Sequence, residues 1–116
     1  VFAGHGAPLL QGIEFYKGAP LFYGLGNFIF QTEKPLGAYP PESWEGVIAE
    51  CAFEGGRCRD VQLVPLTLNE VGLNGPDDMA TRGRQAHAIL NRIAERSPGL
   101  ANAIDISSGR IALLAR

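Results

Sequence analysis

The chain has 116 residues, of which 46% are hydrophobic and 19% charged, and its formal net charge is -2 at pH 7. This composition predicts one small globular domain and excludes global disorder, which requires low hydrophobicity with high net charge. It also argues against a nucleic-acid partner, because the arginines are interspersed with acidic and apolar residues and form no basic stripe. No apolar run reaches the roughly 18 residues that a membrane span requires.

The chain opens on an apolar, strand-like run, Val1–Ala3, without an initiating methionine. A protein rarely begins inside a strand, so we expect upstream sequence to be missing, and any localisation signal with it.

Residues 9–30 predict a hairpin. Residues 10–16 indicate a first strand, and Lys17-Gly18 supplies a tight turn because glycine accepts positive φ. The nearly continuous apolar run 21–25 indicates a second strand, and such runs are typical of strands buried on both faces.

Glycines flank the end of this second strand, at Gly24 and Gly26, and predict a bend or a close backbone approach. Residues 31–45 then form a proline-rich connector. We expect Trp44, the only tryptophan, to anchor this connector to the body of the domain.

Residues 46–68 predict a second hairpin with one apolar face. A three-residue loop, Glu54–Gly56, places a glycine at the left-handed position. It also sets apolar residues opposite each other: Ala49 against Val61, and Val47 against Leu63. A two-residue loop of the glycines alone would set polar residues against that apolar set, because a slip by one residue turns every side chain to the other face. We therefore predict the three-residue loop.

In that register the two cysteines, Cys51 and Cys58, point to opposite faces of the hairpin, too far apart for a disulfide. With the two-residue loop they would be diagonal neighbours on one face, a placement that is still awkward for a disulfide. We predict free thiols. Without a nearby histidine they also make a poor metal site.

A helix is predicted over residues 78–96, with Asp77 and Asp78 at its N-terminus and Pro98-Gly99 beyond its end. One face carries apolar residues at helical spacing: Ala86, Ile89, Leu90, Ile93 and Ala94. A last hairpin follows, with strands at 103–106 and 110–114 around the turn Ser107–Gly109. The fold class is therefore mixed α/β (α+β), with antiparallel hairpins and one long helix.

The candidate for chemistry is Gly4-His5-Gly6, directly after the first strand. A histidine on a loop at the carboxyl end of a strand lies where α/β folds bind ligands, and imidazole is a common metal ligand. The alternative is that His5 makes only a local hydrogen bond. His87 lies on the predicted helix, without a second ligand four residues on, and is expected at the surface.

Residues 4–30 resemble the closing motif of CapA-type poly-gamma-glutamate capsule biosynthesis proteins; they read GHGAPLLQGIEFYKGAPLFYGLGNFIF. In that family a Gly-His segment leads to a short strand ending Tyr-Lys-Gly-Lys/Arg-Pro, and then to Tyr-Ser-Leu-Gly-Asn-Phe. Residues 39–46, 65–69 and the helix ending in Ser97 resemble the C-terminal appendage of some members. The resemblance covers essentially the whole chain.

The resemblance implies that residues 1–116 are the C-terminal half of a four-layer αββα sandwich, similar to calcineurin-like metallophosphoesterases. Residues 1–30 would hold the Gly-His segment and core hairpin, and residues 31–116 the second hairpin, the helix and the final hairpin. The parent protein would bind a divalent metal (manganese, iron or zinc), with His5 as a ligand and with Gly4 and Asn27 at the edge of the site.

Two departures from the family pattern bear on that site. Pro8 stands where many members have a second histidine, and Gly24 replaces the usual serine before Leu-Gly-Asn. The family's earlier carboxylate, asparagine and histidine motifs are absent from the chain. A two-metal centre needs ions about 3.5–4 Å apart with shared ligands, so we expect no activity from the chain alone.

Three hypotheses follow. In the first, favoured by His5 and Asn27, the parent is a metal-dependent, phosphoesterase-like hydrolase whose site is completed by the missing N-terminal half. In the second, favoured by Pro8, it is a capsule-assembly component that keeps the fold without the metals. In the third, the chain is a structural appendage that only packs on the missing half. The resemblance further implies a bacterial cell-surface, membrane-associated or extracytoplasmic location, with the capsule polymer and its synthesis machinery as partners.

Overall fold

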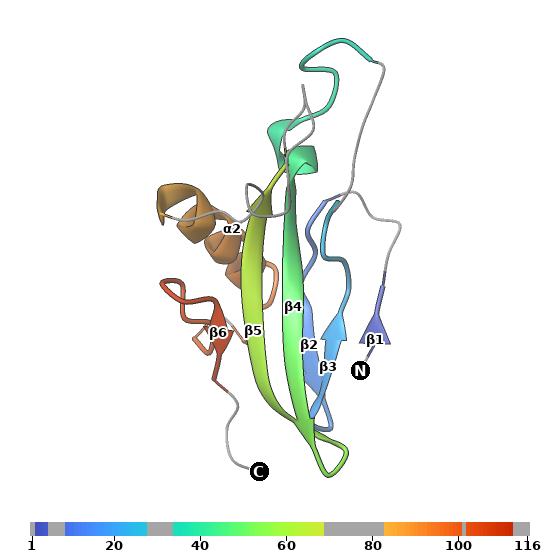
Figure 1. Cartoon of the computed structure of the whole chain (residues 1–116), viewed down its shortest axis with the longest axis vertical. Helices are drawn as coiled ribbons and strands as arrows, with labels where there is room; N and C mark the ends of the chain where they lie inside the picture. The colour runs from blue at the N-terminus through green and yellow to red at the C-terminus, as the bar shows by residue number, and fades with distance from the viewer. Residues whose placement is uncertain (1, 5–8, 28–33, 69–82, 101, 113–116) are drawn as a thin grey trace.

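The computed structural model describes residues 2–4, 9–27, 34–68, 83–100 and 102–112. These residues form two three-stranded sheets, one short 3-10 helix and one α-helix (Figure 1). The elements in chain order are β1 (Phe2–Ala3), β2 (Ile13–Tyr16), β3 (Ala19–Phe22), η1 (Pro41–Trp44), β4 (Glu45–Glu54), β5 (Arg57–Thr67), α2 (Gly83–Glu95) and β6 (Arg110–Ile111). The predicted α+β class is confirmed, whereas the four-layer arrangement stays a prediction.

The first sheet has the strand order β1-β3-β2, with β1 parallel and β2 antiparallel to β3. The predicted hairpin is confirmed: Tyr16 pairs with Ala19 across a two-residue turn. Both turn residues have positive φ, 51° at Lys17 and 78° at Gly18, which matches the right-handed twist of the strands.

The prediction that the second strand is buried on both faces was wrong. Pro20 and Phe22 are buried, but Leu21 is only partly buried and Tyr23 is 46% exposed. The sheet is therefore covered on one face, and the strand ends at Phe22 rather than at residue 25.

The second sheet has the order β4-β5-β6, all antiparallel. The predicted three-residue loop was wrong, because Glu54 pairs with Arg57 across Gly55-Gly56. A register shift next to Ala52 then leaves Arg59 without a partner in the ladder. The bulge adds one residue to β5, so beyond it the apolar side chains of β4 and β5 again point to the same side of the sheet. With the short loop alone they would point to opposite sides.

The resulting pairs lie two residues away from those predicted: Val47 against Pro65, Ala49 against Leu63 and Cys51 against Val61. The expectation of one apolar face is therefore confirmed, although the partners differ.

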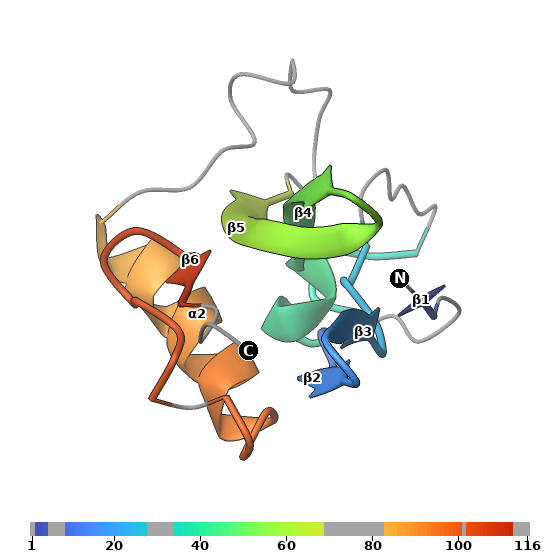
Figure 2. The ribbon, with the colours of Figure 1, turned by 90° about the horizontal axis from the view of Figure 1, so that it is seen from below.

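Helix α2 buries the predicted face against the second sheet, and the five apolar residues predicted for that face are all buried. Its predicted N-terminal residues, Asp77 and Asp78, lie outside the described residues. Figure 2 shows α2 and the β2–β3 hairpin both below the β4–β5 ribbon. The core fills the space between them and contains Leu10, Ile13, Phe22, Val47, Val61, Leu63, Ile89, Leu90, Ile93, Ala94, Ile104 and Ile111.

The last hairpin is present in outline. Gly109 N–H donates to the backbone oxygen of Asp105 at 2.6 Å, which closes the predicted turn. The returning strand β6 pairs with β5 on one side and with residues 103–105 on the other. The Asp105 N–H donates to the oxygen of Arg110 at 2.9 Å, and the Ala112 N–H donates to the oxygen of Ala103 at 2.8 Å, so the predicted hairpin pairing is confirmed. No helix in the described ranges is long and apolar enough to cross a membrane.

Candidate functional site

The predicted site begins where β1 ends. Because β1 and β3 are parallel, their carboxyl ends meet at one edge of the sheet. The N–H of Gly4 continues this pairing and donates to the backbone oxygen of Phe22 at 2.7 Å. A Cβ atom on Gly4 would lie 3.0 Å from the backbone oxygen of Tyr23, so glycine permits this close approach.

His5, the predicted metal ligand, lies outside the described residues, so its role stays a prediction. His87 is exposed on α2, as expected. Within the described part of the chain, no three His, Cys, Asp or Glu side chains gather in a way that could hold a metal ion.

Asn27, predicted at the edge of the site, belongs to a segment that joins the two sheets. Its side-chain Nδ2 donates to the backbone oxygen of Ser43 at 2.8 Å, which holds η1 in place. Gly26 forms a bridge to Gly46, and the N–H of Val47 donates to the oxygen of Leu25 at 2.9 Å. We call residues 25–27 with Glu45–Val47 the inter-sheet joint.

The two glycines of the joint are required by space. A Cβ atom on Gly26 would lie 2.6 Å from the oxygen of Glu45, and one on Gly46 would lie 2.1 Å from the oxygen of Asn27. Gly26 also has a φ of 76°, which disfavours other residues. The predicted close approach at Gly26 is therefore confirmed, and it gives the Leu-Gly-Asn part of the motif a structural role.

Ion pairs brace the joint against α2. Arg92 pairs with Glu45 and, at 3.3 Å, with Glu42, and Arg96 pairs with Glu42 at 3.2 Å. Burial raises the pKa of Glu45, and the guanidinium of Arg92 acts in the opposite direction. These four charges join elements that are distant in sequence, so they act as a structural clamp.

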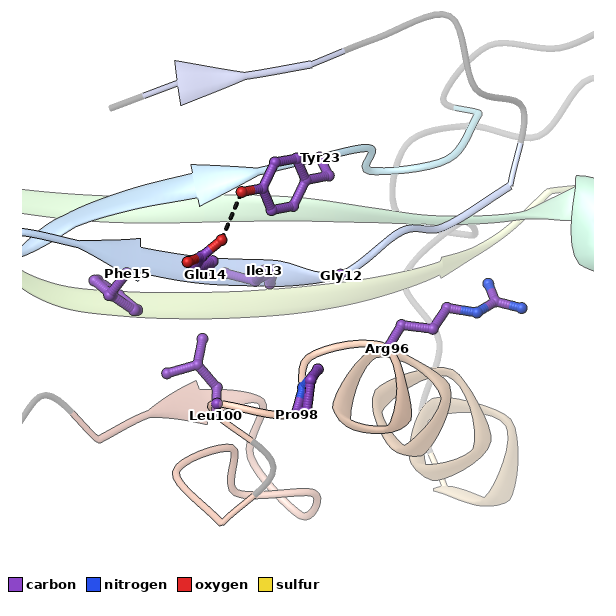
Figure 3. A pocket seen from close by; sticks show the side chains of 9 residues that line it. Gly12, Ile13, Glu14, Phe15, Tyr23, Arg96, Pro98 and Leu100 are labelled. Carbon is purple, nitrogen blue, oxygen red and sulfur yellow. Dashed lines mark hydrogen bonds between the residues drawn. The ribbon is translucent and has the colours of Figure 1, made fainter.

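A cleft of about 410 Å³ lies elsewhere, between the outer edge of β2 and the chain that follows α2 (Figure 3). It is lined by Gly12, Ile13, Glu14, Phe15, Tyr23, Arg96, Pro98, Gly99 and Leu100. The hydroxyl of Tyr23 donates to Glu14 Oε2 at 2.6 Å, and this hydrogen bond raises the pKa of Tyr23. In Figure 3 the guanidinium of Arg96 points away from that pair.

Among the described residues, neither Gly4 nor Asn27 lines the cleft. The hydrogen bond between Tyr23 and Glu14 was not predicted from the sequence, although the sequence contains a signal for it. A two-residue turn at Lys17-Gly18 sets Glu14 opposite Leu21, and this register makes Tyr23 a diagonal neighbour of Glu14 on the same face.

Comparison with known proteins bears on the first part of the chain. Residues 1–32 match the sequence model of a family described as bacterial capsule synthesis protein PGA_cap. Two proteins of Sinorhizobium fredii, the uncharacterized proteins y4sH and y4uA, are each 50% identical to the chain over 38 residues. The aligned stretch is 32% of this chain, and it spans only 8% of the length of either relative.

The N-terminal stretch of the chain is thus similar to bacterial capsule synthesis proteins. In the structure this matched stretch contains β1, β2, β3 and residues 25–27, the first-sheet side of the inter-sheet joint.

Proposed function

We propose that the chain is part of a bacterial capsule biosynthesis protein of the CapA type, which takes part in making a poly-gamma-glutamate surface polymer. The observation that carries this proposal is the family match over residues 1–32. The described residues of this stretch form a sheet and its connection to the rest of the fold, rather than an isolated short motif.

The described residues of this unit favour a role in assembly over chemistry. Gly4 permits the close approach of Tyr23, and the side chain of Asn27 donates to the backbone oxygen of Ser43. The motif residues that can be placed therefore maintain the scaffold. The partners proposed for this role are a preceding part of the same protein, the capsule polymer and the synthesis machinery, at an extracytoplasmic location.

A gene deletion tests the proposal. In the organism that encodes the chain, deleting the complete gene should abolish or strongly reduce the surface polymer, measured as glutamate released by acid hydrolysis of purified capsule. The wild-type gene and a Gly99→Ala variant should restore it, because a Cβ atom on Gly99 meets nothing within 4 Å. Unchanged polymer in the deletion strain would contradict the proposed function.

A second candidate is a metal-dependent, phosphoesterase-like hydrolase. It is favoured by the position of Gly4 at the shared carboxyl edge of two parallel strands, where α/β folds bind ligands. His5 follows Gly4 directly in the sequence. The described residues supply no donor set for a metal pair, so its ligands would come from outside the described residues.

Metal content separates the two candidates. The full-length protein would be dialysed with manganese and analysed by inductively coupled plasma mass spectrometry, beside a His5→Ala variant. Near-stoichiometric metal that falls in the variant would support the hydrolase. A folded protein without metal would exclude the hydrolase and leave the assembly role.

A further inference from the structure

The strand register brings the two cysteines to one face of the β4–β5 hairpin. Cys51 pairs with Val61, and Phe53, two residues further along β4, pairs with Cys58. Alternate residues of a strand share a face, and so do directly paired residues. Cys51 and Cys58 are therefore diagonal neighbours on the same face, and their predicted placement on opposite faces was wrong. The two-residue loop and the bulge cause this difference.

The two thiols are close enough to affect each other, because Cys58 contributes to the raised pKa of Cys51. The Sγ of Cys58 donates to the backbone oxygen of Asp60 at 3.6 Å. Both cysteines are partly buried and pack against the hydrophobic core, and both carry free thiols. Two reduced sulfur atoms are thus held beside each other on a paired ribbon.

We propose that Cys51 and Cys58 form a reversible oxidation site, in which a disulfide closes diagonally across the β4–β5 hairpin. Diagonal neighbours in antiparallel strands have Cα atoms about 7–8 Å apart, whereas disulfides usually require about 4.4–6.8 Å. Closing the bond therefore strains the hairpin. Strained disulfides have more oxidising potentials and are the labile ones, so this bond forms under oxidising conditions and is readily reduced.

The order of the steps follows from the surroundings of each thiol. Burial raises the pKa of Cys51, and the neighbouring Cys58 raises it further. Cys58 lies one residue from the two-residue loop and is flanked by the exposed Arg57 and Arg59. Arg59 pairs with Glu54 at 3.9 Å, so the positive charge of Arg57 is the one that attracts an anionic oxidant. Cys58 therefore reacts first, and Cys51 resolves the intermediate.

With oxidised glutathione as the oxidant, the chemistry balances in two exchanges. The thiolate of Cys58 attacks one glutathione sulfur, which forms a mixed disulfide and releases one glutathione thiolate. The thiolate of Cys51 then attacks the Sγ of Cys58, which forms the protein disulfide and releases the second glutathione. The two protons of the protein thiols end on the two released glutathiones, and two electrons reduce the oxidant.

The test is equilibration of the folded chain in glutathione buffers of increasing oxidation, followed by acid quench, alkylation of remaining thiols and intact-mass measurement. We expect an intramolecular disulfide, seen as the loss of two hydrogen atoms and of both alkylation sites. A Cys58→Ser variant should stay alkylatable at Cys51, and a Cys51→Ser variant should accumulate the mixed disulfide at Cys58. The same reaction in urea shows what the unfolded chain does.

Three outcomes would overturn the proposal. The first is full alkylation of both thiols in the folded chain under the most oxidising buffer. The second is a stable mixed disulfide at Cys58 in the unsubstituted chain, which would mean that Cys51 cannot reach it. The third is a disulfide that forms in urea and is absent from the folded chain, because the native hairpin would then be unable to close the bond.

Discussion

Substitution of Gly46 by alanine should weaken the inter-sheet joint. The added Cβ atom would lie 2.1 Å from the backbone oxygen of Asn27, far inside van der Waals contact. Relief requires the two backbone segments to separate by roughly 1 Å. Such a shift stretches the 2.9 Å hydrogen bond from Val47 N–H to Leu25 beyond its working range, and Val47 is only 5% exposed.

The size of the effect follows from these contacts. Overpacking costs about 1–3 kcal/mol, and a buried N–H that loses its partner costs about 1–3 kcal/mol more. The lower chain entropy of unfolded alanine offsets about 0.4–1 kcal/mol. We therefore expect Gly46→Ala to lower the free energy of unfolding by roughly 1–5 kcal/mol, which is a large part of the stability of a small domain.

The assay is urea denaturation followed by circular dichroism and by the fluorescence of Trp44. This tryptophan is the only one in the chain, is 7% exposed and lies two residues before Gly46, so it reports on the joint itself. Gly99→Ala is the matched control, with open space around its Cβ and an expected change within about 0.5 kcal/mol. Equal midpoints for the two variants would refute the close approach of the segments.

Three further predictions concern single side chains. The buried Ser97 Oγ accepts a hydrogen bond from the Ile13 N–H at 2.8 Å. Ser97→Ala should therefore lower the free energy of unfolding by about 1–3 kcal/mol and expose the Ile13 amide to hydrogen exchange. Unchanged exchange of that amide would contradict this prediction. Hydrogen bonds from Ser107 lower the pKa of Asp105, so its contribution to stability is present above the unfolded value of 3.8 and is lost as the pH falls through the lower folded value. Asp105→Asn should therefore remove part of the acid sensitivity in urea denaturation between roughly pH 5 and pH 2, and an unaltered pH profile would count against it. Burial raises the pKa of Glu45 above 4.5, so the contribution of this carboxyl to stability is greatest below pH 4.5 and is lost as the pH rises through the folded pKa. Relative to wild type, Glu45→Gln should therefore gain stability from about pH 4 to pH 7. A relative loss over this range would contradict the raised pKa.

Local patterns predicted the elements whose causes are local. Lys17-Gly18 specifies a tight turn by its conformational preference, and the spacing of Ala86 to Ala94 specifies which helix face is buried. Both predictions were confirmed because neither depends on a distant part of the chain.

The β4–β5 hairpin shows where local reasoning fails. Pairing apolar residues on one face is a sound criterion, but two routes satisfy it: a three-residue loop, or a two-residue loop with a bulge. Nothing local to Gly55-Gly56 distinguishes these routes. The choice set the register, and the register in turn decided that Cys51 and Cys58 lie on one face rather than on two.

The inter-sheet joint could be predicted only in part. Glycines at the end of a strand indicated a close approach at Gly26, but the partner, Gly46, lies twenty positions further along the chain. The role of Asn27 depends likewise on the distant Ser43. Contacts of this kind leave no periodic signal in one sequence, since each needs the folded arrangement of both segments.

The capsule assay tests the central claim most directly. Surface polymer would be measured in a strain that lacks the complete gene and in strains complemented with the wild-type gene, with Gly99→Ala or with Gly46→Ala. We predict loss of polymer in the deletion strain, recovery with the wild type and Gly99→Ala, and reduced recovery with Gly46→Ala. Normal polymer in the deletion strain would contradict a role in capsule synthesis.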